Sequence, residues 1–191
     1  GMDVDADGCI YVADTHYNQI LKFAPSGKIL LRFGTQGLAP GKFFWPCAVA
    51  VAADGAIYTA EYGGVTEEGY HDRIQKWSPA GEPLAHWGRF GEEEGQFMRP
   101  AGLDLGPDGN LYVADSANHR IQVFTPQGAL LRSWGLQGKR AGELYYPYDI
   151  AVDSVGSVFV VEYGASRVQV FSAEGEPRGV WGRLSRGGEG L

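Results

Sequence analysis

The residues most able to do chemistry are three acidic residues, each followed by an arginine within 5 to 12 positions along the chain. The pairs are Glu61 with Arg73, Asp115 with Arg120 and Glu162 with Arg167, while Asp14 precedes Gln19 instead. A carboxylate beside a guanidinium can form either a charged binding site or a structural ion pair. Because the pattern recurs at regular intervals, we favour one structural pair in each unit, and we keep the three arginines as candidate binding residues.

Patterns typical of catalysis are otherwise scarce. No Gly-x-Ser-x-Gly elbow, phosphate-binding loop or Cys–His pair at catalytic spacing occurs in the sequence. The four histidines, at His16, His71, His86 and His119, fall at different points of the chain pattern. A zinc site needs three or four ligands converging at about 2 Å, which this dispersion disfavours. We therefore assign no catalytic residue and keep His71 and His119 as candidate binding residues.

The acid–arginine pairs lie within an internal repeat. Its clearest marker is Asp-Gly, which starts at Asp7, Asp54 and Asp108 and decays to Val155-Gly156. An aromatic residue followed by glycine keeps the same spacing, at Phe33, Trp87, Trp134 and Trp181. The second repeat is longer than the others because of an insertion at about residues 64–70.

Each repeat predicts four short strands separated by glycine-containing turns. The first strand is expected at 1–4, 48–51, 102–105 and 149–152, followed by an Asp-Gly hairpin in which both residues can take a positive φ. The second is expected at 10–13, 57–60, 111–114 and 158–161, and the third at 20–23, 74–77, 121–124 and 168–171. The fourth ends at the aromatic-Gly pair. Four antiparallel strands per unit are typical of a propeller blade.

The sequence therefore predicts an all-β fold, a β-propeller segment of four four-stranded antiparallel blades. The runs from Gly102 to Gly135 and from Asp149 to Phe171 resemble NHL repeats, and the resemblance extends over nearly the whole chain. The linking pattern Gly91, Gly95, Phe97 and Pro100 is also similar to the family. We expect a single domain over residues 1–191, with blades at about 1–46, 47–100, 101–147 and 148–191.

The resemblance also implies that more blades are usual, about six in many such propellers. The chain starts at the first strand of a repeat and stops within a link. We expect it to be part of a longer propeller, or a homo-oligomer in which two chains close a ring of about eight blades, or a ring closed by its own four blades.

Two metals are implied by the resemblance, zinc held on imidazoles as in amidating lyases and calcium held in the channel as in lactonase-like propellers. Candidate calcium ligands on the innermost strands are Asp3, Asp5, Asp104, Asp149 and Asp153, but Ala50, Ala52 and Ala151 occupy equivalent positions. Because the ring of acids is uneven, we interpret them as solvated groups that line the channel. We expect no cofactor, with calcium or zinc as the alternative.

Charge and hydropathy exclude several partners. The net charge of -7 and a pI near 5.1 disfavour nucleic acid, whose phosphates need clustered Lys and Arg. The sequence contains no run of about 18 apolar residues, the length needed to span a membrane, so we expect no membrane partner. Cys9 and Cys47 fall at opposite ends of their strands, so we expect no disulfide between them. The cellular compartment stays undetermined.

Aromatic residues concentrate in the loops and links expected at one end of the blades. Some of them, such as Trp45, Tyr146, Phe43 and Phe97, could instead fill the links between blades. Tyrosine at such positions favours contacts with a partner. We predict a non-catalytic scaffold that binds a protein, peptide or glycan through this loop-rich face; the alternative is a propeller enzyme, a lyase or metal-dependent hydrolase, with a site at the central channel. The candidate binding residues are Tyr62, Tyr70, His71, Arg73, His119, Arg120, Tyr148, Tyr163 and Arg167.

Overall fold

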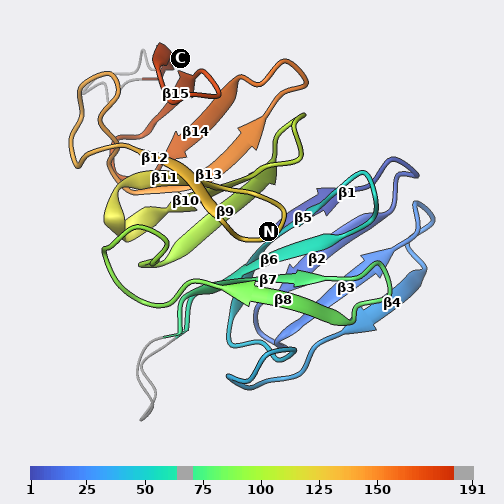
Figure 1. The fold of residues 1–191 in the computed structure, drawn as a ribbon. Helices are drawn as coiled ribbons and strands as arrows, with labels where there is room; N and C mark the ends of the chain where they lie inside the picture. Colours follow the sequence, from blue (N-terminus) through green and yellow to red (C-terminus); the bar gives the residue numbers. More distant parts are fainter. Residues whose placement is uncertain (64–70, 183–191) are drawn as a thin grey trace.

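Four antiparallel sheets form a fan in chain order, as Figure 1 shows for the computed structural model, which describes residues 1–63 and 71–182. Each sheet contains four consecutive strands. The strands are β1 (Met2–Val4), β2 (Ile10–Asp14), β3 (Gln19–Phe23) and β4 (Ile29–Phe33); β5 (Pro46–Val51), β6 (Ile57–Glu61), β7 (Arg73–Trp77) and β8 (Pro83–Trp87); β9 (Pro100–Leu105), β10 (Leu111–Asp115), β11 (Arg120–Phe124) and β12 (Leu130–Trp134); and β13 (Pro147–Val152), β14 (Val158–Glu162), β15 (Arg167–Phe171) and β16 (Pro177–Trp181). One short 3₁₀ helix, η1 (Ser116–Asn118), follows β10. The predicted all-β fold of four four-stranded antiparallel blades is confirmed.

The innermost strands of the second, third and fourth sheets begin two residues earlier than predicted. Pro46, Pro100 and Pro147 each pair with the acid that ends the neighbouring strand, and a β-bulge follows each pairing. A bulge inserts one extra residue into the strand, so the pairing continues on the far side of it, before the predicted strand starts.

The Asp-Gly turns are longer than the two-residue hairpins that the dipeptide predicts. In the first sheet β1 ends at Val4 and β2 begins only at Ile10. The N–H of Gly8 donates to the carbonyl of Asp5 at 2.9 Å, and Gly8 has a φ of 75°. Both residues of the dipeptide tolerate a positive φ, but only the glycine of each such turn adopts one.

Hydrophobic packing lies between the sheets, in three clusters that each join two neighbours. The links between sheets contribute one fully buried side chain to each cluster, namely Phe43, Phe97 and Leu144. The Phe43 ring lies 4.8 Å from the ring of Trp77, centroid to centroid. The interpretation of Phe43 and Phe97 as residues that fill the links is therefore confirmed.

The glycine after each fourth strand allows the link to cross close to these buried rings. Gly88 has a φ of 87°, a region that side-chain-bearing residues rarely adopt. A Cβ at Gly88 would lie 2.3 Å from the Phe97 ring. The recurring aromatic-Gly pair thus has a steric cause.

Aspartates on the innermost strands hydrogen-bond two sheets at once. Asp3 in β1 accepts the N–H of Val4 on Oδ1 and the N–H of Val51, in β5, on Oδ2, both at 2.7 Å. Asp104 in β9 makes the equivalent two bonds, at 2.8 Å within its own sheet and 2.7 Å to the fourth sheet. Sequence analysis interpreted these two acids as solvated channel groups; the structure adds that each carboxylate also joins its own sheet to the neighbouring one.

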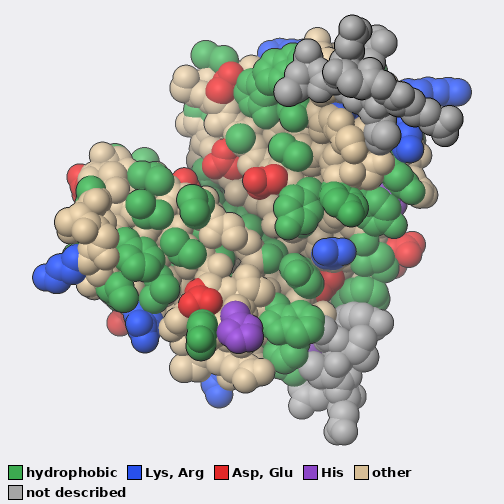
Figure 2. Space-filling model, turned by 180° about the vertical axis from the view of Figure 1, so that it is seen from behind, with side chains coloured by type: hydrophobic (Ala, Val, Ile, Leu, Met, Phe, Trp, Pro, Cys, Tyr) green, Lys and Arg blue, Asp and Glu red, His purple; other side chains and the backbone are tan. Residues whose placement is uncertain are grey.

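The outermost sheets of the fan expose apolar side chains on the faces that no other described sheet covers. Met2 and Val4 of β1 are 71% and 54% exposed, and Trp181 of β16 is 57% exposed. Figure 2 shows hydrophobic side chains gathered on the lobe at the left, which is the first sheet seen from behind. That a second copy of the chain or further blades cover these faces stays a prediction.

Replacing Asp104 with alanine should destabilise the protein by about 1–3 kcal/mol, because two backbone N–H groups lose their acceptor. Asp149→Ala is the matched control, since among residues 1–63 and 71–182 the Asp149 carboxylate accepts only the neighbouring N–H of Ile150, at 3.0 Å. Urea denaturation of both variants measures the free energy of unfolding. Equal losses in the two variants would contradict the proposed bridging role of Asp104.

Candidate functional site

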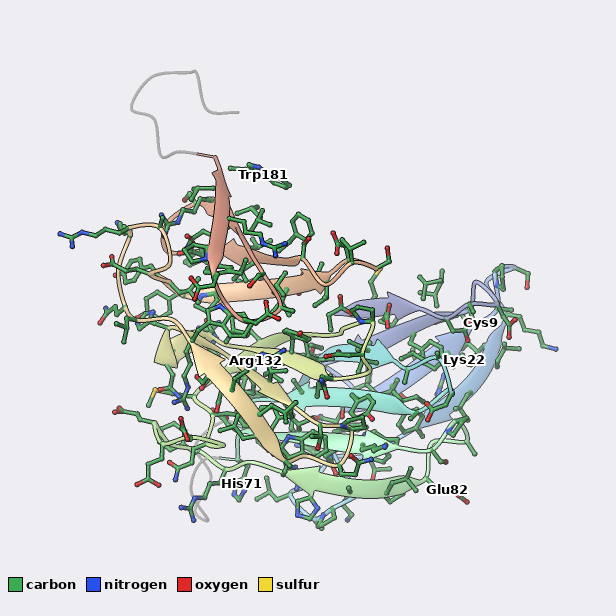
Figure 3. The ribbon with its side chains drawn as sticks, turned by 45° about the horizontal axis from the view of Figure 1, so that its top comes forward. Cys9, Lys22, His71, Glu82, Arg132 and Trp181 are labelled. Atoms are coloured by element: carbon green, nitrogen blue, oxygen red, sulfur yellow. The ribbon has the colours of Figure 1, made fainter. Side chains whose placement is uncertain are left out.

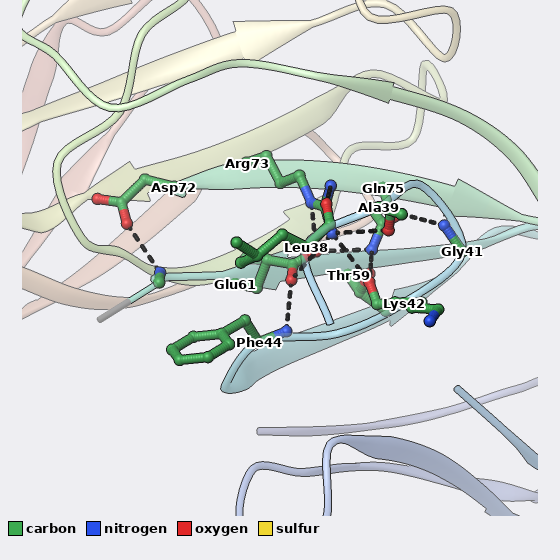
Figure 4. A network of polar contacts seen from close by, with 12 residues as sticks. Leu38, Ala39, Gly41, Lys42, Phe44, Thr59, Glu61, Asp72, Arg73 and Gln75 are labelled. Atoms are coloured by element: carbon green, nitrogen blue, oxygen red, sulfur yellow. Dashed lines mark hydrogen bonds and ion pairs between the residues drawn. The ribbon is translucent and has the colours of Figure 1, made fainter. Parts of the chain in front are cut away.

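The acid–arginine pair of the second sheet belongs to a buried network that holds the preceding link (Figure 4). Arg73 Nε donates to Glu61 Oε1 at 2.8 Å, and Arg73 Nη2 donates to the carbonyl of Lys42 at 2.9 Å. Gln75 donates to the same carboxylate oxygen at 2.6 Å and accepts the N–H of Gly41 at 3.0 Å. Arg73 and Gln75 therefore bind both the Glu61 carboxylate and the irregular link segment.

The same network recurs in the next two sheets and changes in the first. Arg120 pairs with Asp115 at 2.8 Å and Arg167 pairs with Glu162 at 2.6 Å, and both arginines also donate to link carbonyls. In the first sheet Gln19 bonds the acid instead, at 2.9 Å. The structural interpretation of the recurring pairs is confirmed as buried ion pairs, whereas a role of these arginines in binding stays a prediction.

Each link is also held from the preceding sheet, at the residue before its proline. Three residues at this position, Trp45, Arg99 and Tyr146, have positive φ angles of 54°, 60° and 53°. Their backbone N–H groups donate to Asn18 Oδ1 at 2.8 Å, Asp72 Oδ2 at 2.6 Å and His119 Nδ1 at 3.0 Å, respectively. These bonds fix a backbone conformation that is uncommon for residues with side chains, and they set where the three side chains point.

His119 is a neutral acceptor in this arrangement. Its imidazole is 8% exposed and stacks on the Tyr145 ring at 5.4 Å with an interplanar angle of 14°. Burial lowers the pKa of the His119 imidazole, because the charged form loses solvation. Protonation of Nδ1 would remove the acceptor of the Tyr146 N–H, so His119 acts as a structural cap in its neutral form.

The side chains held at this end of the sheets surround a cleft. Its larger cavity, of about 350 Å³, is lined by Arg99, Ser116, Tyr146, Tyr148 and Tyr163. The cavity is thus bounded by three tyrosines, one serine and one arginine.

A smaller cavity of about 210 Å³ continues the cleft and shares Arg99 and Tyr148 with the larger one. Polar groups from Thr15 and Asp149 and the Cys47 thiol line it. Burial raises the pKa of the Cys47 thiol to about 12, so this sulfur is protonated at neutral pH and is no nucleophile. The Cys47 Sγ donates instead to the carbonyl of Pro100 at 3.0 Å.

Arg99 is the exposed cation of the cleft. Its guanidinium carbon lies 5.4 Å from the centroid of the half-buried Tyr62 ring. Among the described residues no carboxylate or carbonyl accepts a hydrogen bond from its side chain, in contrast with Arg73, Arg120 and Arg167. A cation stacked on one ring keeps the edge of its guanidinium open for an anionic group.

Three of the predicted binding residues, Tyr62, Tyr148 and Tyr163, meet at this cleft. Tyr148 lies within β13 rather than in a link, because the strand starts earlier than predicted and Tyr148 occupies its bulge. Tyr70 lies outside the described residues.

The other candidates in the described residues do not line the two cavities of the cleft. His119 and Arg120 line a separate cavity of about 380 Å³. Figure 3 places His71 at the end of the molecule opposite the turns that carry Cys9 and Glu82. The Nε2 of His71 is buried without a hydrogen-bond partner in the part of the chain that the structure describes.

Arg99 and Ser116 were not among the predicted binding residues. Each has a signal in the repeat that could have found it: Arg99 precedes a link proline, and Ser116 follows the recurring acid, as Tyr62 and Tyr163 do. The residues at these two positions differ from blade to blade, which indicates that the shared fold does not fix their identity.

Within residues 1–63 and 71–182, no group of three or more His, Cys, Asp or Glu side chains is arranged to hold a metal ion. Both cysteines are free thiols. In the same part of the chain no helix is long and apolar enough to cross a membrane.

Comparison with known proteins identifies the repeat. Residues 97–124 match the family model described as NHL repeat, which confirms the resemblance drawn from the sequence. This segment contains the buried Phe97, the Asp115–Arg120 ion pair and Arg99.

Solved structures share the fold at low sequence identity. Virginiamycin B lyase from Staphylococcus aureus matches with a TM-score of 0.68 and 17% identity over 95% of this chain and 54% of that chain. A gluconolactonase from Xanthomonas campestris matches with a TM-score of 0.68 and 21% identity over 93% of this chain and 59% of that chain. The WD40 repeats of RRP9 match with a TM-score of 0.68 and 17% identity over 94% of this chain and 49% of that chain. This chain therefore spans roughly half the length of the structures it matches, and both enzymes and repeat scaffolds share its fold.

The His119 cap predicts a specific loss of stability in mild acid. The pKa of His119 is about 6.5 in the unfolded chain and lower in the folded chain. At a pH between these two values the unfolded chain is protonated at His119 and the folded chain is not. The contribution of His119 to stability is therefore complete above about pH 6.5 and is lost as the pH falls below that value. We expect His119→Asn to remove this loss, because Asn18 performs the same capping with an amide oxygen.

The measurement compares the unfolding free energy of the wild type and His119→Asn at about pH 5 and about pH 7.5. Burial raises the pKa of Asp72 to about 6, which contributes an opposite slope in this range, but both proteins share it and it cancels in the difference. Parallel pH profiles of the two proteins would contradict the capping role.

Proposed function

We propose that this propeller segment is a recognition module whose cleft binds a protein, peptide or glycan. The observation that carries the proposal is the gathering of Tyr146, Tyr148, Tyr163 and Arg99 around one cavity. Tyrosine and arginine contribute strongly to binding at interfaces, because each combines a large contact area with polar atoms. A partner group that enters the cavity would contact several of these side chains together.

Exposure of the phenol rings supports a role in binding. The side chains of Tyr163 and Tyr148 are 79% and 55% exposed. Removing apolar surface from water yields about 25 cal/mol per Å², and these two rings keep most of that surface available to a partner. Neither ring serves mainly to fill the core.

Preorganisation of the cleft also supports recognition. Tyr148 lies in the hydrogen-bonded strand β13, and the N–H of Tyr163 donates to the carbonyl of Tyr146 at 3.0 Å. Side chains on a fixed backbone lose less conformational entropy when a ligand binds. The cleft can therefore bind without a large rearrangement of its walls.

An enzyme that works at the central channel, a lyase or a metal-dependent hydrolase, is the alternative. Its support is the fold shared with a lyase and a gluconolactonase. Metal analysis of the purified protein separates the two classes, because stoichiometric zinc or calcium would favour the enzyme.

Tyr148→Ala and Tyr163→Ala should each weaken binding by about 2 kcal/mol, which is about 30-fold in Kd. Each variant loses a tyrosine ring that the bound ligand would bury. Binding is measured by titration against the strongest hits from an array of defined peptides and glycans. Tyr17→Ala is the matched control, because Tyr17 is 70% exposed and does not line the two cavities of the cleft. Unchanged affinity in both cleft variants would show that binding occurs elsewhere.

A further inference from the structure

We propose that Arg99 anchors a carboxylate of a peptide ligand in the cleft, an inference that rests on the proposed recognition function. Arg99 is exposed, lines both cavities and has the Tyr62 ring against its guanidinium. The planar guanidinium can donate two parallel hydrogen bonds to a carboxylate. The larger cavity places three phenol groups around the same position.

The other arginines near the links show what distinguishes Arg99. Arg73, Arg120 and Arg167 are held by a carboxylate on Nε and by link carbonyls on the terminal nitrogens. A ligand could recruit them only by leaving those buried carbonyls unpaired, which costs about 1–3 kcal/mol for each group. The Arg99 guanidinium donates no hydrogen bond to a carboxylate or carbonyl among the described residues, so a ligand can bind its N–H groups without breaking a bond that holds the fold.

The backbone at Arg99 holds the side chain at the cleft. Its φ is 60°, its N–H donates to Asp72 at 2.6 Å and its carbonyl accepts the N–H of Ser116 at 3.2 Å. Trp45 and Tyr146 adopt the same conformation in other links, so the fold accepts different side chains here. The arginine is therefore not required by the architecture.

Charge selects the class of ligand. The protein carries a net charge of -7, which opposes the approach of a polyanion. A polyanionic glycan repeats its negative charge along the chain and a neutral glycan has no carboxylate, whereas a peptide can present one carboxylate beside its backbone N–H groups. The Asp149 carboxylate in the adjoining cavity offers an acceptor for peptide N–H groups. These features together favour a peptide with a single carboxylate.

The test uses pools of short random peptides that contain one glutamate, and matched pools with glutamine in its place. The pools are captured on immobilised protein and quantified by mass spectrometry. We expect the wild type to retain the glutamate peptides at least about tenfold more than their glutamine counterparts, and we expect Arg99→Gln to abolish the preference. Arg99→Lys should keep only part of it, because a lysine cannot bind a carboxylate in the two-point manner. Free and amidated C-termini distinguish a side-chain carboxylate from a terminal one.

Arg89→Gln is the matched control, since Arg89 is also exposed and, within the part of the chain that the structure describes, its guanidinium makes only a 3.9 Å contact with Glu93. The preference should survive in this variant. Equal retention of glutamate and glutamine peptides by the wild type, with Tyr148→Ala still weakening capture, would overturn the role of Arg99 and leave the recognition function intact. Absence of any retained peptide, together with no hit on the array of peptides and glycans, would overturn both. Selective binding of an acidic oligosaccharide on that array would overturn the choice of a peptide.

Discussion

The links between sheets contain backbone groups that no strand ladder pairs, and the fan of sheets depends on satisfying them. Buried carbonyls and amides must be hydrogen-bonded within the protein, because each unpaired group costs about 1–3 kcal/mol. The acid, arginine and glutamine of the following sheet meet this requirement, as Glu61, Arg73 and Gln75 do for the link that contains Lys42. A cap from the preceding sheet completes it, as Asp72 does at Arg99. Each link is thereby fixed to both sheets that it joins.

The positions that bind the link backbone therefore differ from the positions whose side chains can vary. Ion pairs and buried rings recur because every link presents the same carbonyls and the same gap to fill. The residue after the recurring acid differs between blades, being Tyr62 in one blade and Ser116 in the next. Varying side chains on a constant frame gather at one end of the sheets, which explains why the cleft lies there.

Sequence analysis predicted the features that repeat and missed those that depend on one blade meeting another. The strand order, the ion pairs and the buried Phe97 follow from periodicity, which is visible along the chain. The double bridge made by Asp3 is not visible, because its second partner, Val51, lies 48 residues away in a different sheet. Bulges were missed for a related reason: the extra residue between Pro147 and Asp149 is defined only by the pairing of β13 with β14, which no pattern along the chain shows. Arg99 was missed because the repeat marks its position, before a link proline, but the residue there differs from blade to blade.

The same residue type serves two purposes in this fold because of desolvation. A guanidinium withdrawn from water, such as that of Arg73, must find protein acceptors for its donors, and the link carbonyls supply them. Once paired in this way it is part of the frame. The guanidinium of Arg99 remains in contact with solvent and packs one face on Tyr62. A ligand carboxylate at Arg99 displaces water rather than a backbone carbonyl, so recognition there does not compete with folding. The burial of an arginine, more than its charge, decides whether it can bind a partner.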